Sequence, residues 1–186
     1  MFVIQLAKKY TRFNDIPSFT RDGSWEVDTS PDFLLKNIQE HIDNEGLDID
    51  PDFQRPHVWT RAQQRAYIEF FLRRGRTARV IYLNKPSWHF KAKTDYDDFV
   101  LVDGKQRLKA WKDFYDGCFK VFGSYAHEYT DNIRVINTMK LHVNDLQTRA
   151  EVLQWYLDFN SGGTPHTNAE LNKVRKLLKK EEKCSQ

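Results

Sequence analysis

The residues of this chain that are best suited to chemistry lie in one short stretch, from Asp103 to Arg107. It reads Asp-Gly-Lys-Gln-Arg and directly follows the apolar, β-branched run from Val100 to Val102. A strand that stops at a glycine and feeds a helix leaves unpaired backbone N–H groups and partial positive charge at the helix start. Such a turn binds anions, and Gly104 lets a bound group approach the backbone closely. The stretch therefore predicts a phosphate site.

Each side chain of this turn has a candidate role. Asp103 could hold Mg²⁺, orient a water or act as a base, or it could simply cap its own helix. Lys105 and Arg107 could grip phosphate oxygens, Arg107 through a bidentate fork. Gln106 could orient a water, or it could be solvated. We therefore take Asp103, Gln106 and Arg107 as candidate catalytic residues, Asp103 as the candidate metal ligand, and Gly104, Lys105 and Arg107 as candidate nucleotide contacts.

Two other segments could complete a phosphate clamp. Gln54 and Arg55 lie between two prolines, which hold the backbone extended or turned and so preorganise the two side chains. The alternative is a proline-rich surface loop. Asn160 precedes a Gly-Gly pair in a polar turn that could meet a ligand through its backbone. The alternative there is the end of a helix. Gln54, Arg55 and Asn160 are accordingly candidate nucleotide contacts as well.

An excess of arginine in one segment raises the question of nucleic acid. From Arg55 to Arg79 there are seven arginines and a single acid, Glu69, although the net charge of the whole chain is only +3. Such a local excess can face a phosphate backbone, or it can be a solvated helix face. The candidate nucleic-acid contacts are Arg61, Arg65, Arg73, Arg74 and Arg76.

The elements that must position these residues are of the α+β class. The chain has 186 residues, of which 40% are hydrophobic, and this suits one core with a helical appendage. We expect a small mixed sheet with flanking helices, divided into an N-terminal strand or extension (1–29), a nucleotide-binding core (30–145) and a C-terminal helical segment (146–186). Periodicity and breakers predict helices over 31–45, 61–74, 106–115, 148–159 and 169–180, and strands over 78–83, 98–102, 133–136 and 139–143.

The sequence lacks the motifs of several functional classes. The chain has no Walker A pattern, no GxGxxG and no serine nucleophile elbow, and its two cysteines give no disulfide framework or zinc pattern. The first apolar run is too short for a signal peptide, and no stretch approaches the ~18 apolar residues of a membrane span. We expect a protein without a membrane association, in the cytoplasm of a bacterium or a phage-infected host.

Three elements together resemble a known family. They are Gln54-Arg55-Pro56, Asp103-Gly104-Lys105-Gln106-Arg107, and the segment from Asn160 to Pro165, followed by Glu170. They are similar to elements of the ParB/sulfiredoxin-fold family that forms the N-terminal domain of GmrSD-type modification-dependent restriction enzymes. That family's hallmark is Asp-Gly-Gln-Gln-Arg, so Lys105 replaces its first Gln. The resemblance implies that the turn holds the phosphates of a nucleoside triphosphate and supports their hydrolysis or transfer.

The expected function is therefore a nucleoside triphosphate hydrolase or phosphotransferase that uses Mg²⁺ and is linked to DNA modification, restriction or phage defence. Two alternatives stay open: a Mg²⁺-dependent nuclease or nuclease subunit, and a non-catalytic module that binds DNA or nucleotide. The expected partner is a nucleotide, with DNA, a second copy or a nuclease partner as further candidates. The family's C-terminal nuclease domain has no counterpart in these 186 residues, so any cleavage would rely on this domain or on a partner.

Overall fold

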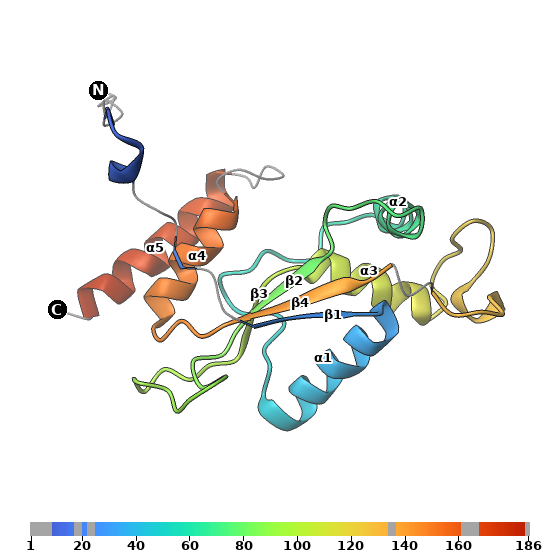
Figure 1. Cartoon of the computed structure of the whole chain (residues 1–186), viewed down its shortest axis with the longest axis horizontal. Coiled ribbons are helices and arrows are strands. Elements are labelled where there is room, and N and C mark those ends of the chain that lie inside the picture. Colours follow the sequence, from blue (N-terminus) through green and yellow to red (C-terminus); the bar gives the residue numbers. More distant parts are fainter. Residues whose placement is uncertain (1–8, 17–19, 22–24, 134–136, 161–167, 185–186) are drawn as a thin grey trace.

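The protein is an α+β fold, as the sequence predicts. The computed structural model describes residues 9–16, 20–21, 25–133, 137–160 and 168–184 (Figure 1). The strands are β1 (Trp25–Thr29), β2 (Val80–Asn84), β3 (Val100–Asp103) and β4 (Met139–Asn144). The helices are α1 (Pro31–Glu45), α2 (Arg61–Leu72), α3 (Lys105–Tyr115), α4 (Arg149–Asn160) and α5 (Asn168–Cys184), with short 3-10 helices η1 (Phe13–Asp15) and η2 (Ala126–Glu128).

The four strands form one mixed sheet in the order β1-β4-β2-β3. β4 lies inside the sheet, antiparallel to β1 and parallel to β2, with Leu141 opposite both Val27 and Ile81. β2 and β3 are antiparallel, and Tyr82 lies opposite Asp103. Beyond β3, Asp48 makes an isolated parallel bridge to Val100. The last residue of β3, and the turn that follows it, therefore lie at the side of the sheet formed by β2 and β3.

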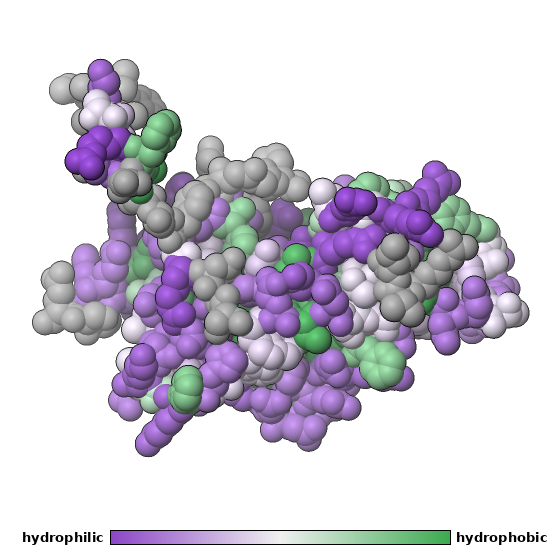
Figure 2. Space-filling view, viewed as in Figure 1, coloured by the Kyte–Doolittle hydropathy of each residue, from purple (hydrophilic) through white to green (hydrophobic). Residues whose placement is uncertain are grey.

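Successive side chains point to opposite faces of the sheet, so the sheet contributes to two hydrophobic cores. In β3, Leu101 belongs to a core with α1, α2 and α3, whereas Val100 and Val102 belong to a second core with α4 and α5. Figure 1 shows α4 and α5 side by side, away from α1 and α2. Hydrophilic side chains dominate the face seen in Figure 2, and the hydrophobic ones are scattered across it. The sheet is thus covered by helices on both faces.

Helix ends fall where local chemistry predicts them. α1 begins at Pro31 and is followed by Gly46 in the left-handed region (φ 69°). α2 begins after Thr60, whose side chain forms a capping box with Gln63. Within the described ranges, no helix combines the length and apolar character needed to cross a membrane.

One predicted strand pairing needs correction. The N-terminal strand or extension expected over 1–29 contains β1 at its end, whereas residues 1–8 lie outside the described residues. The strands expected over 133–136 and 139–143 flank Asn137-Thr138, a plausible hairpin turn. That pairing is wrong, because both edges of β4 are taken by β1 and β2. Residues 134–136 themselves lie outside the described residues. A turn signal reports only on neighbouring residues, whereas the pairings of β4 depend on strands far away in the sequence.

Gly104 is fixed by two independent constraints. Its φ of +112° lies in a region that side chains rarely adopt. A Cβ at this position would also lie 2.5 Å from Cδ1 and 3.3 Å from Cα of Ile81 in β2. The strand can therefore turn directly into α3 only because residue 104 has no side chain.

We predict that Gly104→Ala lowers the free energy of unfolding by about 3 kcal/mol, since backbone strain adds to the overlap with Ile81. Gly46→Ala is the matched control, because Gly46 also has a positive φ (+69°) but nothing lies within 4 Å of its added Cβ. It should cost only about 1 kcal/mol. Urea unfolding of both variants measures the difference, and equal losses would contradict the role of Ile81.

Candidate functional site

The predicted strand–turn–helix is present. β3 ends at Asp103, Gly104 is the N-cap of α3, and the helix begins at Lys105. Because the N-cap position is taken by Gly104, Asp103 is not the N-cap residue of α3, contrary to the alternative expectation. The carboxylate of Asp103 instead forms an ion pair with the guanidinium of Arg107, one turn along the helix. The acid and the cation predicted to act on phosphate therefore lie in contact.

Arg107 keeps hydrogen-bonding capacity that the protein does not use. Its side chain is 17% exposed, against 39% for Asp103. Within the described part of the chain, its Nε atom is buried and has no hydrogen-bond partner. A buried cationic donor without an acceptor is costly, and native proteins rarely leave one. This donor lies beside a partly exposed carboxylate at a helix N-terminus, where an anion would find both charge and backbone N–H groups.

Gln106 holds the proline-bracketed segment against the motif helix. Its buried amide oxygen accepts from the backbone N–H groups of Val58 (3.0 Å) and Trp59 (3.2 Å), and its Nε2 donates to the carbonyl of Pro56 (3.2 Å). The side-chain amide thus takes the place of a strand neighbour for this segment. Gln106 acts as a positioning residue here, and its expected catalytic role stays a prediction.

Gln54 has a similar structural task. Its side chain is buried, and Nε2 donates to the carbonyl of Leu101 in β3 at 2.6 Å. Its backbone N–H donates to the carbonyl of Pro51 at 2.9 Å, which closes a turn. Gln54 therefore fixes the segment that carries Arg55, and its direct contact with a nucleotide stays a prediction.

Tyr156 of α4 completes the site, and sequence reasoning missed it. Burial raises the pKa of its phenol to about 12, while the charge of Arg55 and a hydrogen bond with the backbone of Arg55 act in the opposite direction. The charges of Asp103 and of Glu170 in α5 also act on this phenol. The charges of Arg55, Asp103 and Glu170 thus all act on one buried hydroxyl. Nothing in the local sequence around Tyr156 marks it, because these three residues come from three other segments.

Asn160 lies at the end of α4, one turn beyond Tyr156. Its Nδ2 donates to the carbonyl of Tyr156 at 2.6 Å, so it ends the helix as the alternative expectation had it. Residues 161–167, with the predicted Gly-Gly turn, lie outside the described residues. Asn160 is thus bonded to the residue whose phenol the charges of Arg55 and Asp103 act on, and its contact with a nucleotide stays a prediction.

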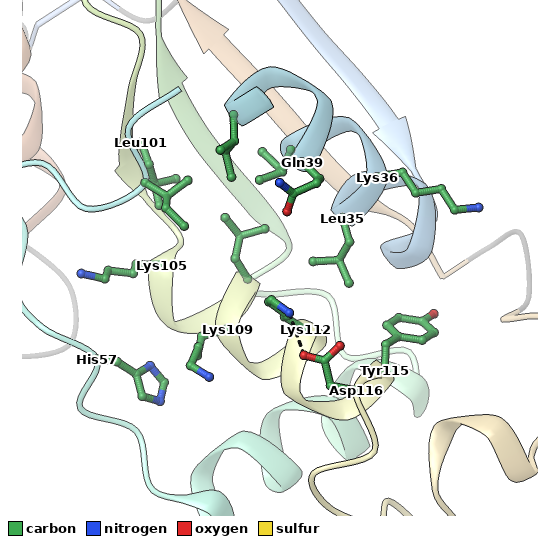
Figure 3. A pocket seen from close by; sticks show the side chains of 14 residues that line it. Leu35, Lys36, Gln39, His57, Leu101, Lys105, Lys109, Lys112, Tyr115 and Asp116 are labelled. Atoms are coloured by element: carbon green, nitrogen blue, oxygen red, sulfur yellow. Dashed lines mark hydrogen bonds and ion pairs between the residues drawn. The ribbon is translucent and has the colours of Figure 1, made fainter. Parts of the chain in front are cut away.

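Lys105 has other partners than Arg107, although both cations belong to the same turn. Its ammonium forms an ion pair with Asp50 and donates to the carbonyl of Arg55 at 3.3 Å. It also lines a cavity between α1 and α3 (Figure 3). The two cations of the turn therefore have different partners, Asp50 for Lys105 and Asp103 for Arg107.

Three of the five predicted nucleic-acid arginines contact other groups of the protein. Arg61 pairs with Asp113 (2.5 Å), Arg65 donates to the carbonyl of Lys120 (2.8 Å), and Arg73 lies 5.0 Å from the ring centre of Phe122. Arg74 and Arg76 are exposed in the segment after α2. All five arginines are exposed, and their contact with nucleic acid stays a prediction.

Asp113 is the acid that gathers these contacts. Its side chain is 6% exposed. The carboxylate forms ion pairs with Arg61 and Lys109 and accepts a hydrogen bond from the Nε2 of Gln64 (2.9 Å). Burial by itself would raise the pKa of Asp113. The hydrogen bonds from Lys109, Gln64 and Arg61 outweigh burial and hold the pKa below its ordinary value. This network ties α2 to α3 and so keeps the motif helix in place.

Comparison with known protein families matches residues 34–135 to the family described as GmrSD restriction endonuclease, N-terminal domain. The matched segment is more than half of the chain, and it contains both the Gln54–Arg55 pair and the Asp103–Arg107 turn. It omits β1, β4, α4 and α5. No curated protein and no solved structure matches the chain.

We predict that Asp113→Asn lowers the free energy of unfolding by about 2 kcal/mol at pH 7, because three charge-assisted contacts weaken. The folded pKa is the lower one, so this stability is present above the unfolded pKa of about 4 and is lost as pH falls through the folded value. Denaturant unfolding of both proteins from pH 7 to pH 3 should show the gap closing below pH 4. A gap that is independent of pH would contradict the assignment.

Proposed function

The chain belongs to the family of GmrSD restriction endonuclease N-terminal domains, and from this premise we propose that it binds a nucleoside triphosphate at the Asp103–Arg107 turn. In this proposal the domain hydrolyses the triphosphate or transfers its terminal phosphoryl group, in association with restriction or phage defence. The observation that carries the proposal is the buried Nε of Arg107, which has no partner among the described residues and adjoins the carboxylate of Asp103.

The residues present have the chemistry that phosphate binding needs. The first N–H groups of α3 and the guanidinium of Arg107 are donors for phosphate oxygens. Arg55 adds a second cation from the segment that Gln54 and Gln106 hold in place. Phosphoryl transfer asks mainly for such positioning and neutralisation of charge.

Mg²⁺ fits this site through one protein ligand. Among the described residues no group of three or more His, Cys, Asp or Glu side chains could hold a metal by itself. Magnesium in phosphoryl-transfer sites is commonly held by one or two carboxylates together with the phosphates of the substrate. Asp103 is the carboxylate that would hold it, and the ion would supply neutralisation of phosphate charge. If Asp103 held the metal, its ion pair with Arg107 would break, and the guanidinium would then be available to the phosphates.

A role for DNA stays the second candidate. The family's description as a restriction endonuclease and the exposed Arg74 and Arg76 favour contact with a phosphate backbone. In that case the same Asp103 would serve a Mg²⁺-dependent nuclease or a nuclease subunit, or the domain would bind without chemistry. Steep salt dependence of DNA binding would distinguish these alternatives from a nucleotide enzyme that works without DNA.

We expect wild-type protein to bind at least one of ATP, GTP, CTP and UTP in the presence of Mg²⁺, and Arg107→Ala to weaken that binding roughly tenfold to a hundredfold. Calorimetry measures the binding. Arg175→Ala is the control, because Arg175 is exposed on α5 and contacts only its neighbour Asn172 among the described residues (3.1 Å). Thermal unfolding checks that Arg107→Ala is folded. Failure of all four triphosphates to bind would overturn the proposal.

We expect Asp103→Asn to retain triphosphate binding but to slow its consumption by about a hundredfold or more, because the amide cannot act as a base or hold Mg²⁺ as a carboxylate does. The measurement is loss of the triphosphate with time in the presence of Mg²⁺, which counts hydrolysis and transfer alike. Asp95→Asn removes an exposed carboxylate elsewhere and serves as the control. Unchanged consumption in Asp103→Asn would remove Asp103 from the catalytic residues.

A further inference from the structure

A cavity of about 360 Å³ lies between α1 and α3. Figure 3 shows Leu35 and Gln39 on α1 facing α3, with Lys105, Lys109 and Lys112 along α3. The walls are largely apolar, and the apolar side chains that line them are Leu35, Ile38, Ile42, Ile49, Leu101 and Leu108. A volume of this size lies within the range of small-molecule sites, which are mostly apolar with a few placed polar groups.

The charged residues around the cavity are strongly biased toward cations. Lys36, Lys105, Lys109 and Lys112 line it, against the single acid Asp116. Lys112 pairs with Asp116 at 2.7 Å, and Lys105 and Lys109 pair with acids that do not line the cavity. The ion pairs of Lys105 and Lys112 use carboxylates that are 73% and 50% exposed, so water weakens them and an incoming anion can compete.

The cavity is separate from the Asp103–Arg107 pair. In β3, Leu101 faces the cavity, whereas Val102 packs on the other side of the sheet against α4 and α5. Tyr82, opposite Asp103, packs on that second side as well. Lys105 alone belongs both to the cavity wall and to the motif. An occupant of the cavity would therefore act on the turn only through α3 and Lys105.

We propose that this cavity binds a small organic anion with an apolar body, such as a carboxylate, sulfonate or phosphate carried on an aliphatic or aromatic group. The apolar floor takes the body, and the lysines of α3 take the anionic group. A macromolecule would need a much wider contact than this concave space offers. Because Lys105 contacts the carbonyl of Arg55, an occupant that binds Lys105 would also affect the position of Arg55 at the triphosphate site. That consequence rests on the proposed function, whereas binding to the cavity does not.

The test uses the whole chain and the fluorescent anion 1-anilinonaphthalene-8-sulfonate, without any nucleotide. We expect saturable binding at one site, displaced by dodecanoate but not by dodecanol at the same concentration. Lys109→Glu should lower the affinity for the probe roughly fivefold to tenfold, because it reverses a charge at the cavity wall. Leu35→Trp should abolish binding by filling the space while every lysine is kept.

Lys91→Glu is the matched control, since Lys91 is exposed and does not line the cavity, and its probe affinity should stay unchanged. Cooperative thermal unfolding of each variant shows that the probe reports on folded protein. Three results would overturn the proposal: unsaturable binding, equal effects of Lys109→Glu and Lys91→Glu, or equal displacement by dodecanol and dodecanoate. A wild-type dimer that Leu35→Trp converts to a monomer would also overturn it, because a second copy would then cover the cavity. Loss of triphosphate binding by Arg107→Ala is measured separately, so the two proposals fail independently.

Discussion

The side-chain amide of Gln106 connects the two segments on which the candidate site depends. Its contacts reach back 47 to 50 residues, to Pro56, Val58 and Trp59. Among the described residues this segment has no strand neighbour to satisfy its backbone groups, and a buried unsatisfied N–H is costly. Gln54 supports the same segment from its other end, at Leu101. As a result the segment that carries Arg55 is held against the start of α3 and against β3, which is the kind of preorganisation that the proposed phosphate site would need.

Where a signal was local, the sequence was a good guide. Pro31 and Gly46 mark the ends of α1, and Thr60 marks the start of α2, because caps and left-handed residues act on their immediate neighbours. The turn at Gly104 follows from the same kind of chemistry. Where partners lie far away, the sequence was silent or misleading. The pairing of β1 and β2 with β4 was missed for this reason, and so was Tyr156. The expected likeness to ParB and sulfiredoxin stays a prediction.

Charge patterns illustrate the same limit at the level of single side chains. An arginine-rich segment is visible in the sequence, but the partners of Arg61, Arg65 and Arg73 lie in α3 or shortly beyond it. Asp113 neutralises part of this charge from a buried position, and no spacing rule reveals that. Lys105 is a similar case. It is a cation in the middle of the predicted phosphate motif, but it forms an ion pair with Asp50 and donates a hydrogen bond to the carbonyl of Arg55. Residue type indicated possible chemistry, and distant contacts decided which residues are free to perform it.

The strand order sets a limit on how the domain can be divided. β4 is an inner strand, yet it is the last in sequence and lies beyond residue 135, where the family match ends. A fragment bounded by that match would lack β1 and β4, and Tyr82 of β2 would have no neighbour on its β4 side. During synthesis the sheet cannot close until residue 144 has left the ribosome, and its inner pairings span long sequence separations. The segment by which relatives are recognised is therefore smaller than the unit that folds.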